Sequence, residues 1–277
     1  MSRPLSLARL MSFSLTSFVP GPRVADTHRR SAALHGDVLD ESWRVGPFPK
    51  SRVKVELSTR HNRAVHTDPL VEEAIERIWS EHKQRAPQIF NGSKFRLHRW
   101  RVDHVTASPV LHLQCGLTDY KTYLATCCSE MVTRLRKDGE QVCGGDANAF
   151  LSRKIGVSAV VETSDRRVAL IERSRSVGVY QHLFDTPGGH PEPSALPLTA
   201  EELVALEDDT EKHQLLELAA VDRLFGSIVD EVHEEINVSA DHVVEPTLLG
   251  VVFQSEAETP SFGEHMLLEI PTLTATD

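Results

Sequence analysis

The feature that most constrains this chain is a helical apolar stripe that ends in carboxylates. Apolar side chains recur at helical spacing over residues 221–232, where they are Val221, Leu224, Phe225, Ile228 and Val232. This spacing predicts a helix with one buried face. At about 100° per residue, Glu235 lies within roughly 20° of Ile228 and Glu231 within roughly 60°. Because an unpaired buried carboxylate is costly, we expect a cation beside these acids.

A divalent metal ion is the cation that these acids favour. Glu231, Glu234 and Glu235 stand at positions i, i+3 and i+4, so they share one side of the helix and repel each other. Their carboxylate oxygens suit Mg²⁺ or Mn²⁺. A nearby arginine could compensate instead, and a solvated acidic end on a surface helix is the plain alternative, since runs of charge usually mark exposed faces.

A second segment, PGGHPEP at 187–193, places two glycines in a turn bounded by prolines. Without a Cβ, Gly189 lets its backbone approach an ion closely, so its carbonyl is a candidate metal ligand. Gly188 and Gly189 are also candidate substrate contacts, with a plain turn as the alternative. Arg175 is a third candidate for substrate binding, because a guanidinium matches phosphate oxygens bidentately. Its alternative is a solvent-facing residue at a strand end.

Together these residues resemble the Nudix hydrolase signature. The three glutamates match its downstream acids, and Gly189 matches its first glycine. Asp222 stands where the signature has an earlier glutamate, with about 27 extra residues between it and Gly189; a salt bridge with a neighbour is its alternative role. Asp230 replaces the signature's arginine. Asn237 replaces its glycine, a mild change because asparagine also tolerates a left-handed helix cap.

The resemblance narrows to the uridine diphosphate (UDP) glucose pyrophosphatase group of Nudix hydrolases, whose signature contains an insertion. It covers about residues 53–250 through the segments KFRLH at 94–98, GLTDY at 116–120, IGVSA at 155–159, RSR at 173–175 and LFGSIVDEVHEEIN at 224–237. It implies Mg²⁺-dependent hydrolysis of UDP-glucose and UDP-galactose to UMP and a sugar 1-phosphate, with Mn²⁺ as a possible substitute.

The resemblance also implies roles for individual residues. Glu231 and Glu235 become metal ligands, and Glu234 becomes a third ligand or the base, so all three take part in catalysis. Glu264 matches a further acid of the family weakly. Two other functions stay open: a catalytically inactive Nudix module that binds a nucleotide sugar or a protein partner, and a metal-binding acidic helix in an unrelated α/β protein.

The implied fold is α/β, a Nudix-type α/β/α sandwich preceded by a small α/β domain. We expect a disordered extension or transit peptide over 1–50, the amino-terminal domain over 51–150, and the Nudix domain over 151–277 with an insertion at about 194–220. No candidate helix follows the last candidate strand, at 265–270, where the family has a second flanking helix. We therefore expect the sandwich to be incomplete at its carboxyl end, with part of the sheet exposed.

Local patterns predict the other elements. Asp68 before Pro69 predicts a capped helix over 69–84. A second helix is expected over 119–136, and another over part of 200–218. Alternation of apolar and polar residues predicts strands at 53–57, 95–102, 110–117, 156–163, 167–174 and 247–253.

The amino-acid composition limits the classes of molecule that this chain is expected to bind. The chain has 277 residues and a formal net charge of −10, which disfavours nucleic-acid binding; no apolar run is long enough for a membrane span. Its four cysteines form no metal-binding pattern and are expected to be reduced. We expect a small-molecule nucleotide sugar as the partner and an intracellular, cytoplasmic location. Arginines and serines in the first 25 residues make a mitochondrial location the alternative, and the sequence does not indicate an oligomeric state.

Overall fold

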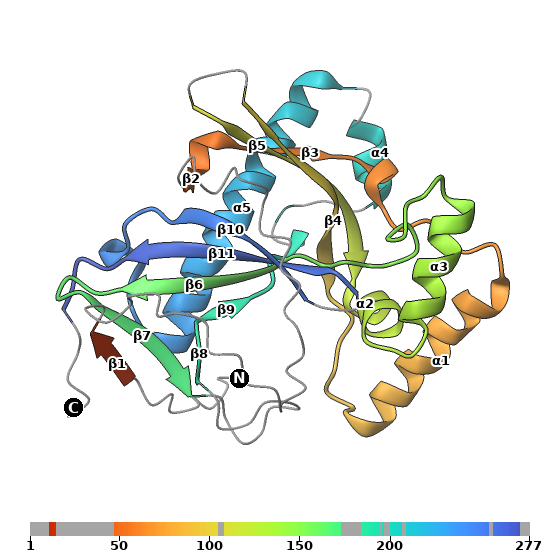
Figure 1. The fold of residues 1–277 in the computed structure, drawn as a ribbon, viewed down its shortest axis with the longest axis horizontal. Coiled ribbons are helices and arrows are strands. Elements are labelled where there is room, and N and C mark those ends of the chain that lie inside the picture. Colours follow the sequence, from red (N-terminus) through yellow and green to blue (C-terminus); the bar gives the residue numbers. More distant parts are fainter. Residues whose placement is uncertain are drawn as a thin grey trace, which may run out of the picture.

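The structure is a computed structural model that describes residues 11–14, 47–104, 108–172, 184–193, 196, 200–206, 209–254 and 257–271. Two sheets organise it (Figure 1). The larger sheet has the strand order β1-β7-β6-β11-β10-β2, while β8 pairs with β7 and β9 pairs with β6. The smaller sheet has the order β3-β5-β4. This mixed α/β architecture agrees with the Nudix-type sandwich and small α/β domain expected from the sequence.

The larger sheet is antiparallel except where β6 and β11 run parallel. The strands predicted at 156–163 and 167–174 form an antiparallel hairpin, closed where the backbone N–H of Thr163 donates to the carbonyl of Arg167. The last strand begins at Thr259, six residues before the predicted start at 265, and ends at Leu267, three residues before the predicted end at 270. The strands are β1 (Met11–Ser14), β2 (Phe48–Pro49), β6 (Gly156–Glu162), β7 (Arg167–Glu172), β8 (Phe184–Asp185), β9 (Gly188–Gly189), β10 (Thr247–Gln254) and β11 (Thr259–Leu267).

The smaller sheet and three helices form the amino-terminal domain. Asp68 caps α1 as predicted, since its carboxylate accepts the backbone N–H of Leu70. The single helix predicted over 119–136 is wrong, because the chain forms two helices there. Ser129 accounts for the break: its hydroxyl donates to the carbonyl of Ala125 and accepts from the backbone of Met131. The elements are β3 (Val53–Leu57), α1 (Pro69–Arg85), β4 (Ser93–Asp103), β5 (Val110–Asp119), α2 (Tyr120–Cys127) and α3 (Val132–Val142).

One long helix connects the two domains. Helix α5 (Thr210–Ile236) joins the helical part of the insertion to the acidic segment without a break, and α4 (Ala200–Leu206) precedes it. Near its start, α5 contacts β3, where Glu217 accepts the backbone N–H of Leu57. Further along, it contacts β6 and β9 and crosses one face of the larger sheet (Figure 1). Short 3₁₀ turns occur at Lys50–Arg52, Thr59–His61 and Ala240–His242.

The two sheets also meet through β4 and the segment before β6. The backbone of Leu97 donates to the carbonyl of Arg153, and the backbone of Ile155 donates to that of Phe95. Arg96 is 1 % exposed and donates to the carbonyls of Leu151, His61 and Asn148. Burial lowers the pKa of Arg96 to about 10. The KFRLH segment therefore holds the domains together through a buried guanidinium.

Two features differ from the expected extension over 1–50. Residues Met11–Ser14 pair with β7, and Phe48 is 2 % exposed in the main hydrophobic core. The rest of the proposed domain division stays a prediction. No helix follows α5 among the described residues except the 3₁₀ turn at Ala240–His242. Within the described chain no helix is long and apolar enough to cross a membrane, and Cys115, Cys127, Cys128 and Cys143 are free thiols.

Candidate active site

The end of α5 confirms the helix predicted over the acidic segment. Glu231 and Glu235 are partly buried, whereas Glu234 is exposed. The helix ends at Asn237, which takes a left-handed conformation (φ 55°, ψ 37°) and donates its backbone N–H to the carbonyl of His233. Asparagine therefore provides the cap that the family signature obtains from glycine.

The two partly buried acids contact the backbone of the glycine turn. The Glu235 carboxylate accepts the N–H of Gly188 at 3.0 Å. One helical turn earlier, the Glu231 carboxylate accepts the N–H of His190. Two segments more than 40 residues apart in the chain are thus joined by charge-assisted hydrogen bonds. The unrelated-fold alternative, in which PGGHPEP would lie far from Glu231, is excluded by this contact.

Glycine is required at positions 188 and 189 because other atoms of the chain approach the backbone closely there. A Cβ added at Gly189 would lie 1.7 Å from Oε1 of Glu231, and one added at Gly188 would lie 2.6 Å from the carbonyl oxygen of Val157. Neither glycine has a positive φ, so the backbone conformation itself does not demand glycine. The missing Cβ atoms let α5 and β6 approach β9 from its two sides, which a plain turn would not need.

Burial and the neighbouring acids raise the pKa of Glu231. Burial, followed by the charges of Glu235 and Glu234, raises the pKa of Glu231 to about 7, although the His190 N–H opposes the shift. At neutral pH about half of the Glu231 side chains therefore carry a proton. A cation bound beside them would remove this repulsion and release that proton.

A divalent cation fits the chemistry of these donors, although the side chains are not already gathered around one. Within the described residues, no three His, Cys, Asp or Glu side chains are close enough together to hold a metal ion. Glu231 and Glu235 nevertheless present carboxylate oxygens beside Gly189, where no Cβ blocks access. Glu234 is exposed. Its role as a third ligand or base, and that of the Gly189 carbonyl, stay predictions.

Two other acids of the signature lie outside this arrangement. Asp222 is exposed and forms a salt bridge with Lys50 at 3.0 Å, although the expected alternative was a salt bridge with the adjacent Arg223 or another neighbour. Asp230, which stands in place of the signature's arginine, pairs with Arg223 at 2.8 Å. Both carboxylates are therefore neutralised by basic side chains of this chain.

Glu264 is a buried acid that the sequence analysis reached only through a weak family match. It is 1 % exposed on β11, and its Oε2 has no hydrogen-bond partner among the described residues. Burial raises the pKa of Glu264 to about 8. Alternation along β11 could have found it, because Phe262, Met266 and Leu268 occupy the buried positions of the same face.

We expect Glu264→Gln to remove a pH dependence of stability. The glutamate has a pKa near 4.5 in the unfolded chain and about 8 in the folded one. The folded state therefore holds a proton that the unfolded state loses, so stability falls as pH rises from about 4.5 toward 8, by about 1.4 kcal/mol per pH unit at most, and levels off above 8. In EDTA between pH 6 and 8, the melting temperature of the wild type should fall more steeply than that of Glu264→Gln. Parallel curves would contradict this account.

An open cleft of about 290 Å³ borders the glycine turn. Backbone of β6, β9 and β11 forms its walls, and Glu235 reaches it from α5. Two charged residues from elsewhere also line it, Lys154 before β6 and Asp185 on β8. Arg175, predicted to bind phosphate, lies outside the described residues.

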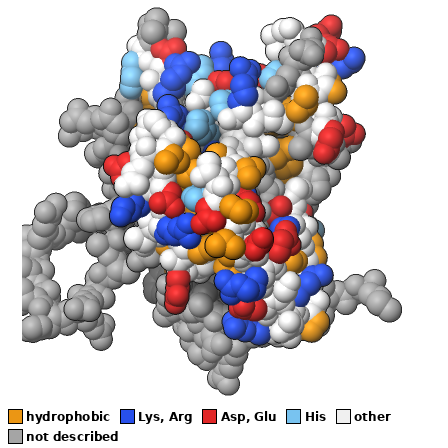
Figure 2. All heavy atoms as spheres, turned by 90° about the vertical axis from the view of Figure 1, so that its right-hand side faces the viewer, with side chains coloured by type: hydrophobic (Ala, Val, Ile, Leu, Met, Phe, Trp, Pro, Cys, Tyr) orange, Lys and Arg blue, Asp and Glu red, His pale blue; other side chains and the backbone are white. Residues whose placement is uncertain are grey.

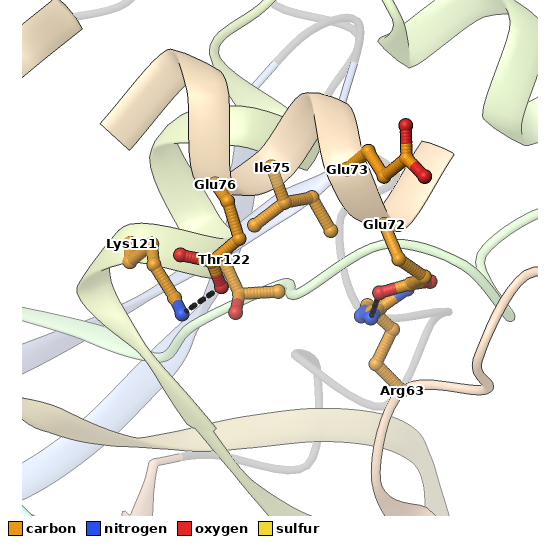
Figure 3. A pocket seen from close by; sticks show the side chains of 7 residues that line it. All are labelled: Arg63, Glu72, Glu73, Ile75, Glu76, Lys121 and Thr122. Atoms are coloured by element: carbon orange, nitrogen blue, oxygen red, sulfur yellow. Dashed lines mark hydrogen bonds and ion pairs between the residues drawn. The ribbon is translucent and has the colours of Figure 1, made fainter. Parts of the chain in front are cut away.

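A larger hollow of about 430 Å³ lies in the amino-terminal domain (Figure 3). Its cations are already paired, Arg63 with Glu72 and Lys121 with Glu76, and Glu73 points away from the other side chains. On the side of α1 and α3, acidic and basic side chains are interspersed over the surface (Figure 2). The hollow therefore offers no unpaired cation to an anionic ligand, so the cleft beside Gly189 is the candidate site.

Comparison with known proteins agrees with this geometry, although no family model matches the chain. The chain is 35% identical over 209 residues to the uridine diphosphate glucose pyrophosphatase NUDT22 of Bos taurus, which covers 74% of this chain and 68% of that protein. Its counterpart in Mus musculus is 35% identical over 208 residues (75% and 64%). Nudix hydrolase 9 of Arabidopsis thaliana is 31% identical over 208 residues (73% and 64%).

The fold and the contact between acidic helix and glycine turn define a Nudix architecture. With the relatives above, they show that the chain belongs to the Nudix hydrolase family. The chain spans only about two thirds of the length of these relatives, 64% to 68%. What they act on therefore enters below as a proposal.

Proposed function

We propose that this protein is a divalent-metal-dependent hydrolase of nucleoside diphosphate sugars, cleaving UDP-glucose or UDP-galactose to UMP and a sugar 1-phosphate. The observation that supports it most directly is the contact of Glu231 and Glu235 with the backbone of His190 and Gly188. The signature glutamates thereby lie against the glycine turn beside an open cleft. The choice of a UDP-sugar rests on the names of the NUDT22 relatives.

The chain's own residues account for most of the expected chemistry. A bound Mg²⁺, or Mn²⁺ in its place, would neutralise diphosphate charge and lower the pKa of a coordinated water. Glu231 and Glu235 would hold the metal, with Glu234 as a third ligand or as the group that accepts the water's proton. The hydrogen bonds from Gly188 and His190 hold the first two carboxylates against the glycine turn that borders the cleft.

The test is direct incubation of purified protein with UDP-glucose and Mg²⁺, with chromatography of the products. We expect UMP and glucose 1-phosphate in equal amounts, and neither product in EDTA. UDP-galactose in parallel tests the sugar, and Mn²⁺ in place of Mg²⁺ tests the metal. If the protein binds UDP-glucose but releases no UMP with either metal, the inactive-module alternative replaces this proposal.

A further inference from the structure

Lys154 is a buried lysine at the candidate site without an acidic partner. Its side chain is 4 % exposed and lines the cleft that Gly188, Gly189 and Glu235 also border. Its ammonium lies 4.1 Å from the centre of the Tyr123 ring. Among the described residues, no carboxylate forms an ion pair with it. A buried ammonium without a counter-ion is costly, so this position needs an explanation.

The neighbours of Lys154 increase that cost. The titratable groups around it are the thiols of Cys127 and Cys128 and the phenol of Tyr123 on α2, the ammonium of Lys94 on β4, and His190 after β9. Burial raises the pKa of the Cys128 thiol and of the Tyr123 phenol, so neither group is charged at pH 7. The nearby carboxylate of Glu192 is already paired with Lys94. Burial, with a smaller contribution from the charge of Lys94, lowers the pKa of Lys154 to about 8.

The cleft therefore contains both acidic and basic side chains. Glu235 and Asp185 bring acidic groups to it, and the partly protonated Glu231 lies against Gly189 at its edge. Lys154 brings a cation, still protonated at pH 7, within the same 290 Å³. A ligand that suits both must be able to share a metal with the carboxylates and present a further anionic oxygen to an ammonium. A diphosphate has both properties.

We propose that Lys154 is a substrate-binding residue whose ammonium contacts a phosphoryl oxygen of the nucleotide. This inference rests on the proposed function for the identity of the nucleotide. The contact with Tyr123 holds the ammonium in place before the ligand arrives, since a cation is attracted to the face of an aromatic ring. The phosphoryl group then provides the counter-charge that the described residues do not supply.

The test measures binding of UMP to metal-free protein in EDTA by calorimetry, so that it does not depend on hydrolysis. We expect Lys154→Met, which keeps the apolar contact with Tyr123, to weaken UMP binding by about 10- to 100-fold, as loss of a charge-assisted hydrogen bond predicts. Lys154→Arg keeps the charge and should retain most of the affinity. Melting temperatures of the three proteins verify that each is folded.

Two further readouts separate substrate binding from a structural role. Wild-type affinity for UMP should fall as pH rises through about 8, where the ammonium loses its proton, whereas Lys154→Met should show no such fall. With UDP-glucose, Lys154→Met should raise KM with little change in kcat. Uridine, which has no phosphate, should bind wild type and Lys154→Met alike.

The outcomes are distinguishable from failure of the proposed function. If UDP-glucose is not hydrolysed but UMP binding depends on Lys154, this contact stands and the proposed reaction fails. If hydrolysis occurs and Lys154→Met binds UMP as tightly as wild type, the inference is overturned. It is also overturned if millimolar UMP fails to bind wild type, or if the substitution weakens uridine binding as much as UMP binding.

Discussion

Glu231→Gln should abolish hydrolysis while leaving the fold intact. The amide is a poor metal ligand and cannot take up a proton, so we expect turnover of UDP-glucose to fall by about 1,000-fold, equivalent to about 4 kcal/mol of transition-state stabilisation. Folded Glu231 has a pKa of about 7, well above the value near 4.5 expected in the unfolded chain. The free energy of unfolding of the wild type therefore falls as pH rises from about 4.5 toward 7. In EDTA at pH 8, the variant should melt at least as high as wild type.

Metal-induced stabilisation provides the second readout for Glu231→Gln. Millimolar Mg²⁺ should raise the melting temperature of the wild type, because a ligand that binds only the folded state stabilises it by mass action, and should raise that of the variant far less. Glu211→Gln is the matched control, since Glu211 is exposed in the first turn of the same helix. Its turnover and metal response should match wild type. Wild-type turnover in Glu231→Gln would show that the site is assigned wrongly.

Local sequence patterns predicted the elements whose causes are local. The cap at Asp68 and the alternation of β3 were visible because each depends on neighbouring residues. The break between α2 and α3 was missed, since the Ser129 hydroxyl competes for a backbone carbonyl that helical periodicity does not reveal. The early start of β11 was also missed, because Thr259–Glu264 pairs with β10 and β6, and pairing partners lie far away in sequence.

In the candidate site, too, the sequence predicted only those residues whose placement has a local cause. Glu231 and Glu235 were found because helical geometry alone places them beside the apolar stripe, and the structure shows both partly buried there. Lys154 was not found. Nothing around it in sequence marks it as buried; its burial results from α2 and β4 of the other domain packing over it. Burial by segments distant in the sequence becomes visible only in the folded chain.

The two adjacent glycines should respond differently to alanine, because different atoms occupy the space beside them. At Gly189 the added Cβ meets the end of the Glu231 side chain, which can rotate away. We expect Gly189→Ala to keep its fold, with a cost below about 1.5 kcal/mol, and to lose most hydrolysis and Mg²⁺-induced stabilisation because Glu231 is displaced. At Gly188 the Cβ meets backbone, 2.6 Å from the Val157 carbonyl oxygen, which cannot move without disturbing β6.

Gly188→Ala should therefore lower stability by about 1–3 kcal/mol, the range for overpacking against a rigid neighbour. Gly226→Ala is the control: this glycine lies within α5 with nothing within 4 Å of the added Cβ, so alanine should stabilise the helix by about 0.5–1 kcal/mol and leave turnover unchanged. Urea unfolding gives the stabilities and UMP release gives the activities. If Gly189→Ala turns over substrate normally, the carboxylate of Glu231 does not need its place beside that glycine, and the metal site must be sought elsewhere along the cleft.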